Sequence, residues 1–154
     1  MTGRAIIAAE RPDTPDARAL IDELEAYLIP LSPAESRHGY SVEKLLAQDV
    51  AFFVIRVDGE AVGCGGIQFF DGEYGELKRM YVRPAHRGRG LAKQMLEELA
   101  AHAARHGIGV LRLETGVAQT EAIGLYERSG FHEIPPFGEY NLDPHSVFYE
   151  KRIE

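Results

Sequence analysis

The stretch that decides the fold is Val82-Arg-Pro-Ala-His-Arg-Gly-Arg-Gly-Leu-Ala92. It contains a proline, two glycines and three arginines, and it lies between an apolar run, Leu77 to Val82, and an amphipathic segment that begins at Leu91. This order predicts a strand, a tight cationic turn and the start of a helix. A helix N-terminus carries unpaired backbone N–H groups at the positive end of its dipole, and glycines let a ligand approach them closely. We therefore expect the turn to bind a phosphate group.

Length, charge and cysteine content limit the class of protein. The 154 residues predict one domain, residues 1–154, large enough to bury a core without disulfides or a metal. The formal net charge of -7 argues against nucleic-acid binding, because such proteins gain affinity by neutralising phosphates. The single cysteine, Cys64, excludes an internal disulfide and fits a reducing compartment. No apolar run reaches membrane-spanning length and no signal-peptide core is visible, so we expect a cytoplasmic protein without a membrane partner.

The chain before residue 50 predicts one strand and two helices. Ala5 to Ala9 is a short apolar run typical of a strand. Thr14-Pro15-Asp16 supplies a capping residue, a proline at the first helical position and an acid in the first turn, and it predicts a helix from about Pro15 to Leu28. Two prolines then end the helix and introduce a polar loop, Ser32 to Tyr40, after which Ser41 can cap a short helix.

Three strands joined by tight turns are expected next. Val50 to Val57 is rich in β-branched and aromatic residues, and Asp58-Gly59 is a hairpin turn. The returning strand runs from Ala61 to Phe70, and a third follows from about Tyr74 to Val82. These strands form an antiparallel meander.

The chain after the Arg/Gly turn predicts a change to parallel pairing. A helix begins at Leu91 and ends at Gly107, and the strand Val110 to Thr115 follows without a hairpin, which is typical of a parallel crossover. Thr120 opens another helix, which Gly130 ends. The last two expected strands are Phe131 to Ile134 and Ser146 to Lys151. The sequence therefore predicts an α+β fold.

Three motifs together resemble the GNAT N-acetyltransferase superfamily, from about residue 50 to the end of the chain. They are the turn Arg87-Gly-Arg-Gly-Leu-Ala92, the preceding strand Glu76-Leu-Lys-Arg-Met-Tyr-Val82, and the segment Gln119-Thr-Glu-Ala-Ile-Gly-Leu-Tyr-Glu-Arg-Ser-Gly-Phe131. The resemblance implies a mixed, largely antiparallel sheet of about seven strands with about four helices. It places the parallel crossover at the centre of that sheet.

The resemblance also implies acetyl-CoA as the cosubstrate. The family's turn binds the diphosphate with backbone amides, which here places Arg87, Gly88, Arg89, Gly90 and Ala92 at the cofactor, with added charge from Lys93. The strand residues Tyr81 and Val82 would offer backbone groups to the pantetheine arm, in a cleft where this strand splays from its neighbour, and Gln119 replaces the family's usual asparagine. The turn does not match the dinucleotide-binding motif, because the third glycine of that motif is replaced by Lys93. The P-loop motif Gly-x-x-x-x-Gly-Lys-Ser/Thr does not occur in the sequence. A simple glycine-rich connection stays the alternative.

Two residues carry the chemistry that the resemblance implies. Tyr126 lies where the family places a tyrosine that protonates the leaving thiolate, and the alternative is an aromatic side chain that only packs. Glu76 lies on the cofactor strand, where some members carry a general base, and the alternative is an ion pair with Lys78. Strand alternation puts Glu76, Lys78, Met80 and Val82 on one face, opposite Leu77, Arg79 and Tyr81.

Other reactive residue types have simpler interpretations. Cys64 lies in a glycine-rich strand and is expected to be a small buried residue and not a nucleophile. His102 and His106 stand one helical turn apart, but no third ligand accompanies them, so no metal site is expected.

Specificity in the family comes from the loop between the first two helices and from the last hairpin. Here these segments hold Arg37, His38 and Tyr40, and Phe137 and Tyr140. The two basic residues are suited to a carboxylate and the aromatic residues to the wall of a pocket, although a solvated loop with packed rings is the alternative. We expect N-acetylation of a small primary amine, such as an amino acid, in a ternary complex. A protein or peptide acetyltransferase and a non-catalytic acyl-CoA sensor are the alternatives, and a homodimer stays open.

Overall fold

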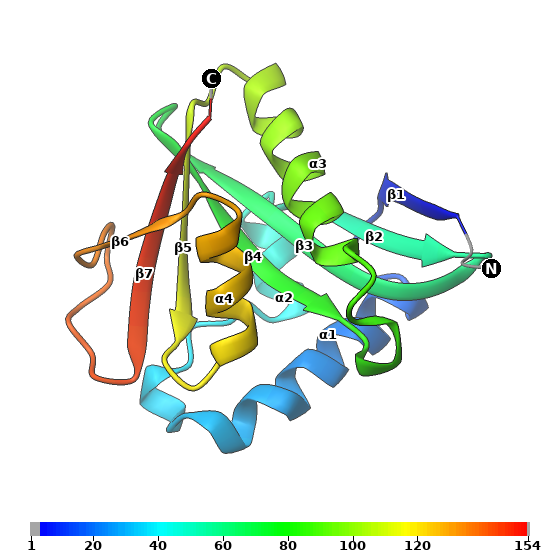
Figure 1. Cartoon of the computed structure of the whole chain (residues 1–154), viewed down its shortest axis with the longest axis horizontal. Coiled ribbons are helices and arrows are strands. Elements are labelled where there is room, and N and C mark those ends of the chain that lie inside the picture. The colour runs from blue at the N-terminus through cyan, green and yellow to red at the C-terminus, as the bar shows by residue number, and fades with distance from the viewer. Residues whose placement is uncertain (1–3, 154) are drawn as a thin grey trace.

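The computed structural model describes residues 4–153 and contains a seven-stranded sheet flanked by helices (Figure 1). The strands are β1 (Ala5–Ala9), β2 (Ala51–Val57), β3 (Glu60–Phe70), β4 (Tyr74–Val82), β5 (Val110–Gly116), β6 (His132–Ile134) and β7 (Ser146–Arg152). The α-helices are α1 (Pro15–Leu28), α2 (Val42–Ala47), α3 (Leu91–Arg105) and α4 (Thr120–Arg128). Short 3-10 turns occupy Ile29–Leu31, Ala34–Ser36 and Pro84–His86. The predicted elements are confirmed, with boundaries that shift by one or two residues.

The strand order is β1-β2-β3-β4-β5-β7-β6, and the pairing between β4 and β5 is parallel. All the other neighbouring strands pair antiparallel. The α+β class and the central crossover through α3 are therefore confirmed. Local sequence determines where several elements begin. For example, Thr14 caps α1 by accepting a hydrogen bond from the Ala17 amide, 3.2 Å away.

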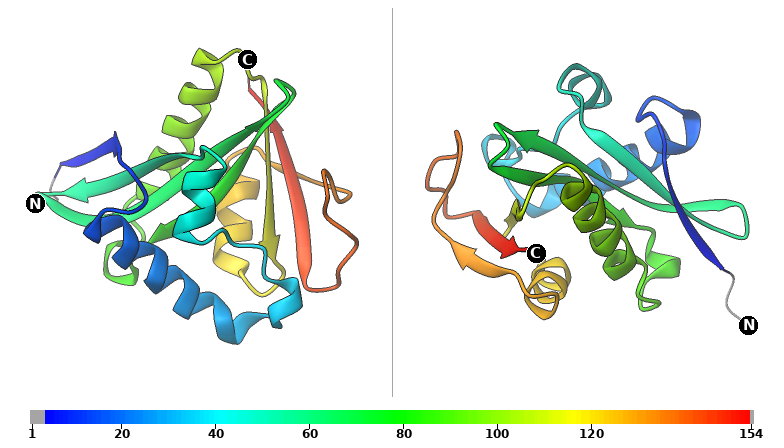
Figure 2. Two further views of the ribbon diagram at one scale, coloured as in Figure 1. Left: turned by 180° about the vertical axis from the view of Figure 1, so that it is seen from behind. Right: turned by 90° about the horizontal axis from the view of Figure 1, so that it is seen from above.

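The helices cover both faces of the sheet. Figure 1 shows α3 and α4 in front of it, and the reverse view in Figure 2 shows α1 and α2 behind it. One core cluster packs α3 against the sheet around Met95, Leu99 and Leu111, while a second packs α1 and α2 around Leu20 and Leu45. Among residues 4–153, no helix combines the length and the apolar character that crossing a membrane would require.

The two central parallel strands separate soon after they meet. Their ladder contains only Gly75 opposite Leu111 and Glu76 opposite Arg112. Beyond these pairs β5 continues alongside β7, and β4 continues alongside β3, so a wedge opens between β4 and β5 (Figure 1). The splay expected from the sequence is confirmed. Beyond Glu76 and Arg112, the facing edges of β4 and β5 therefore have no strand of the described chain paired between them.

A β-bulge in β4 interrupts the expected alternation. Arg79 has a φ of 54°, and the register with β3 shifts between Cys64 and Gly66. Beyond the bulge, Met80 packs on the α3 side with Leu77, whereas Tyr81 joins the core on the α1 side. The predicted faces are therefore wrong after Lys78, because one extra residue in the strand reverses the direction of the side chains that follow.

Candidate active site

Two adjoining cavities occupy the wedge between β4 and β5. The turn cavity lies between the end of β4, the start of α3 and α4. The loop cavity lies between the middle of β4, β5 and the loop that follows α1. Four residues line both cavities, namely Leu24, Met80, Gln119 and Tyr126. The two spaces therefore meet beside the β4 bulge and the Tyr126 side chain.

The turn cavity contains the Arg/Gly turn at its rim. Gly88 and Gly90 have φ values of 81° and 77°, and apart from their own neighbours along the chain no atom of the described residues lies within 4 Å of a Cβ built on either. Gly90 is the N-cap of α3, and within residues 4–153 no side chain caps that helix end. The first amides of α3 therefore face open space at the positive end of the helix dipole, which suits a phosphate group.

Most of the residues predicted at the cofactor line this cavity. They are Tyr81, Val82, Arg87, Gly88, Gly90, Ala92, Lys93 and Gln119. Arg87 is held by donating from its Nε to the Val82 carbonyl at 2.9 Å. Arg89 is the exception, because its exposed side chain lies outside the lining and contacts His86 Nδ1 at 3.4 Å. His86 and Arg128 also line the cavity and were not predicted from the sequence.

The loop cavity contains a buried ion pair on β4. Glu76 Oε2 accepts from Lys78 Nζ at 3.0 Å and from the Tyr140 hydroxyl at 2.5 Å, and both members of the ion pair are buried. Lys78 Nζ also lies 3.9 Å from the centroid of the Tyr40 ring. Within residues 4–153 no hydrogen bond uses Glu76 Oε1. The ion pair that the sequence left as the alternative for Glu76 is therefore present, and it occupies one of the two carboxylate oxygens.

A second carboxylate of this cavity was not predicted from the sequence. Glu114 on β5 accepts from Ser146 Oγ at 2.8 Å, and burial raises the pKa of its carboxyl above the usual value. A raised pKa makes a carboxylate a better proton acceptor near neutral pH. The available signal was the alternation of β5, where polar Arg112 and Glu114 interrupt buried Leu111, Leu113 and Thr115.

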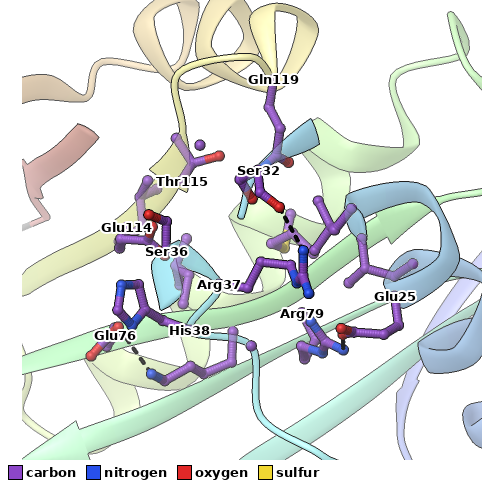
Figure 3. Close-up of a pocket in the computed structure, with 18 of the residues that line it drawn as sticks. Glu25, Ser32, Ser36, Arg37, His38, Glu76, Arg79, Glu114, Thr115 and Gln119 are labelled. Carbon is purple, nitrogen blue, oxygen red and sulfur yellow. Dashed lines mark hydrogen bonds and ion pairs between the residues drawn. The ribbon is translucent and has the colours of Figure 1, made fainter. Parts of the chain in front are cut away.

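The loop residues predicted to bind the substrate fall into two groups. Arg37, His38 and Tyr140 line the loop cavity, and Figure 3 shows the first two projecting from the segment after α1. Arg37 Nη1 donates to the carbonyls of Ile29 and Ser32, which leaves its other nitrogens without a partner in residues 4–153. Tyr40 and Phe137 lie outside the lining. Tyr40 covers Lys78, and buried Phe137 packs edge-on against Tyr140 with ring centroids 5.2 Å apart.

Tyr126 lies where the two cavities meet. Its side chain is buried and packs edge-on against Phe131, and burial raises the pKa of its hydroxyl above the usual value. The negative charge of Glu114 raises the same pKa further. No hydrogen bond within residues 4–153 uses the Tyr126 hydroxyl, in contrast to Tyr149, whose hydroxyl donates to Glu127 at 2.9 Å. Tyr126 therefore lines both cavities, with a hydroxyl that has no hydrogen-bond partner within residues 4–153.

Cys64 and the histidines of α3 lie in packed surroundings. Cys64 is buried, its thiol donates to the Arg79 carbonyl at 3.3 Å, and burial raises its pKa to about 12. The thiolate is therefore scarce at neutral pH, which disfavours a nucleophilic role. His102 stacks on Phe69 with ring centroids 5.7 Å apart, and His106 lies against the same ring. In the described part of the chain no group of three or more metal-binding side chains is found.

Comparison with known proteins identifies the family. The family model described as "Acetyltransferase (GNAT) family" matches residues 17–131. The chain is also 44% identical over 148 residues to the IAA acetyltransferase of Azospirillum brasilense, which covers 96% of this chain and 97% of that protein. The chain belongs to the acetyltransferase (GNAT) family. It is therefore an N-acetyltransferase by family, and the resemblance based on the three motifs is confirmed.

Solved GNAT structures share this architecture. A Klebsiella pneumoniae protein, named provisionally as an acyl-CoA N-acyltransferase, is 37% identical and superposes with a TM-score of 0.84 over 97% of this chain and 98% of that one. The PaiA N-acetyltransferase of Thermoplasma acidophilum, solved in complex with coenzyme A, is 20% identical and has a TM-score of 0.74 over 96% and 99% of the two chains. The second likeness concerns the fold alone.

The turn cavity fits the acyl-CoA cosubstrate of GNAT enzymes. The cradle at Gly88 and Gly90 is open, the amides at the start of α3 are uncapped within the described chain, and Arg87 and Lys93 add positive charge. A diphosphate requires this combination of close backbone approach and positive potential. The apolar side chains of Leu91 and Leu125 complete the lining. The residues present therefore match the group that the family uses.

Proposed function

We propose that this GNAT protein transfers the acetyl group of acetyl-CoA to the primary amine of a small molecule, an amino acid or a related metabolite. The observation that carries the proposal is that the turn cavity, with the uncapped start of α3, meets the loop cavity, with its carboxylates, at Tyr126, whose hydroxyl has no partner within residues 4–153. Direct transfer in a ternary complex needs both substrates side by side, and adjoining cavities provide this. The proposal includes residues 1–154 as one acetyltransferase domain and a cytoplasmic location.

Acetyl-CoA would be held by the turn and by the open edge of β4. Backbone amides at Gly88, Gly90 and Ala92 would bind the diphosphate, with Arg87, Arg89 and Lys93 adding charge around it. Tyr81 and Val82 would offer backbone groups to the pantetheine arm, and Gln119, which lines both cavities, would contact the same arm. The cosubstrate supplies the activated acetyl thioester, and the chain supplies the groups that orient it and move protons.

The acceptor amine must lose a proton. Three carboxylates of residues 4–153 line the loop cavity, and because Glu25 is paired with Arg79, the candidates for accepting the proton are Glu76 and Glu114. Glu76 stays a candidate through Oε1, which has no hydrogen-bond partner within residues 4–153, but its Oε2 already accepts hydrogen bonds from Lys78 and Tyr140. Glu114 carries a pKa raised by burial and accepts from Ser146. We therefore assign Glu114 as the general base, directly or through a water molecule, and Glu76 as a carboxylate that orients the amine.

The departing thiolate must gain a proton, and Tyr126 is suited to provide it. A phenol is protonated at neutral pH, and the hydroxyl of Tyr126 has no protein hydrogen-bond partner within residues 4–153 that would compete for this proton. The reaction then forms the amide C–N bond, breaks the thioester C–S bond and moves one proton from the amine to a base and one from Tyr126 to sulfur.

The far end of the loop cavity would determine the acceptor. The Arg37 nitrogens that have no partner within residues 4–153, together with the ring of His38, are suited to a carboxylate on the substrate. Tyr40, Phe137 and Tyr140 form aromatic surroundings at this end, with His38 lying edge-on to Tyr140 at a centroid distance of 5.1 Å. Side chains from both segments thus line this end of the cavity, which supports the proposal of a small acceptor.

A thiol-release screen tests the proposal. Purified protein is incubated with acetyl-CoA and amino acids, polyamines, aminoglycosides or peptides, and free CoA thiol is measured. Release with small amines that carry a carboxylate is the expected result. Release with peptides alone would favour protein acetylation. Binding of acetyl-CoA without release across the whole panel would refute the enzymatic proposal and favour a sensor.

A further inference from the structure

Arg79 combines three unfavourable features at the meeting point of the two cavities. It is a non-glycine residue in the left-handed region, with a φ of 54°. Its guanidinium is buried, with only 4% of the side chain exposed, and its Nε has no hydrogen-bond partner within residues 4–153. Such features persist when surrounding contacts impose them, and they gather at functional positions.

Contacts from β3 hold the backbone of Arg79. The Cys64 thiol donates to the Arg79 carbonyl at 3.3 Å, across the shifted register of the two strands. Gly65, the residue after Cys64, leaves room for Met80, which follows Arg79 in the bulge. A Cβ on Gly65 would lie only 2.7 Å from the Met80 sulfur. β3 is therefore shaped to fit the bulge in β4. The bulge lies beside both cavities, because Met80 lines each of them.

Contacts from the other side hold the guanidinium. Arg79 Nη2 donates to Glu25 Oε1 of α1 at 2.5 Å, which Figure 3 shows as a dashed line. The loop that carries Arg37 and His38 passes close to the same group, because a Cβ on Gly39 would overlap Arg79 Nη1. One side chain thus joins β4, α1 and the loop at the acceptor end of the cavity.

We infer that Arg79 is a positioning residue, which fixes β4 beside the reacting groups with its backbone and the Arg37–Gly39 loop with its guanidinium. The inference rests on the proposed function, because the loop is taken to bind the acceptor. It predicts that loosening the Arg79–Glu25 contact weakens acceptor binding more than acetyl-CoA binding. The turn cavity gets its charged groups from other elements, so its affinity is expected to change little.

A second ion pair between the same elements provides a matched control. Arg83 at the end of β4 donates from Nη2 to Glu23 Oε2 of α1 at 2.8 Å, and neither residue lines a cavity in the described chain. Glu25→Gln and Arg79→Lys are compared with Glu23→Gln and Arg83→Lys. The first two are expected to raise the acceptor KM about fivefold and to change the acetyl-CoA KM by less than about twofold, and the control variants to change neither. The double variant Glu25→Gln/Arg79→Lys should resemble Arg79→Lys alone, because Arg79→Lys already removes the guanidinium contact with Glu25.

Hydrogen exchange measured by mass spectrometry tests the inference without turnover. Glu25→Gln is expected to increase deuterium uptake in peptides covering residues 37–40 and 76–82, and Glu23→Gln to leave them unchanged. An equal increase in both variants, or none in either, would overturn the inference, as would equal KM changes in both pairs of variants. Failure of the wild type to release thiol with any amine would refute the proposed function instead, and the exchange data would still decide the role of Arg79.

Discussion

Replacement of Tyr126 by phenylalanine separates catalysis from packing. The hydroxyl has no hydrogen-bond partner within residues 4–153, and the ring packs against Phe131, so Tyr126→Phe keeps the packing and breaks no protein hydrogen bond. We expect the free energy of unfolding to change by less than about 0.5 kcal/mol. Loss of the proton donor is expected to lower kcat about a hundredfold, which corresponds to about 2.7 kcal/mol of transition-state stabilisation.

Tyr149→Phe is the matched control for this prediction. Tyr149 is also buried, but its hydroxyl donates to Glu127 at 2.9 Å and it lines neither cavity in the described chain. Tyr149→Phe removes this hydrogen bond and is expected to lower the free energy of unfolding by about 1 kcal/mol, a fall of about 2–4 °C in Tm. The variant is expected to keep the wild-type kcat.

The assay measures CoA thiol release at saturating acetyl-CoA and acceptor, together with thermal unfolding and the acetyl-CoA Kd of each variant. The two variants are expected to differ in opposite ways. Tyr126→Phe loses turnover and keeps its stability, whereas Tyr149→Phe keeps its turnover and loses stability. Unchanged kcat in Tyr126→Phe would remove Tyr126 from the mechanism. Equal losses of kcat in both variants would show that the effect is only structural.

Three further predictions follow from the site and the core. Glu114→Gln should lower kcat/KM about a hundredfold and remove the titration of Glu114 from the pH profile. Burial raises the pKa of Glu114 in the folded state above 4.5, so ionisation of this carboxyl destabilises the wild-type fold as the pH rises. Thermal unfolding should therefore show the variant gaining stability relative to wild type at pH 8 but not at pH 4. Gly90→Ala should weaken acetyl-CoA binding about tenfold in titration calorimetry. The control Gly72→Ala has a similar backbone strain, with a φ of 69° in a turn outside the cavities, and should leave acetyl-CoA binding unchanged. Leu99→Ala should lower the free energy of unfolding by about 2–5 kcal/mol in a denaturant titration, because this side chain is fully buried against the sheet.

Much of the fold could be predicted because its signals are local. The Thr14-Pro15 pair starts α1, Gly59 and Gly72 turn the chain in the meander, and the absence of a hairpin before Val110 predicts the parallel crossover. Each signal depends on a backbone preference of one or two residues, so it needs no tertiary contact.

The candidate site was predicted less completely because it depends on contacts between distant segments. Glu114 lies 38 residues from Glu76 along the chain, and its raised pKa follows from burial that only packing produces. The sequence left open whether Glu76 acts as a base or pairs with Lys78. The structure contains the buried ion pair, and a catalytic role for Glu76 stays a proposal. Neither carboxylate could be ranked as a base from residue types alone.

The sequence by itself determined the order of the elements, the cationic turn at the start of α3 and the family to which these motifs belong. Only the tertiary structure decided which way the side chains of β4 point. An arginine disfavours a positive φ, so no local preference predicts the bulge at Arg79. Cys64 and Gly65 of the neighbouring strand accommodate the bulge, and Glu25 of α1 holds the guanidinium. The reversed faces of β4 therefore follow from long-range packing.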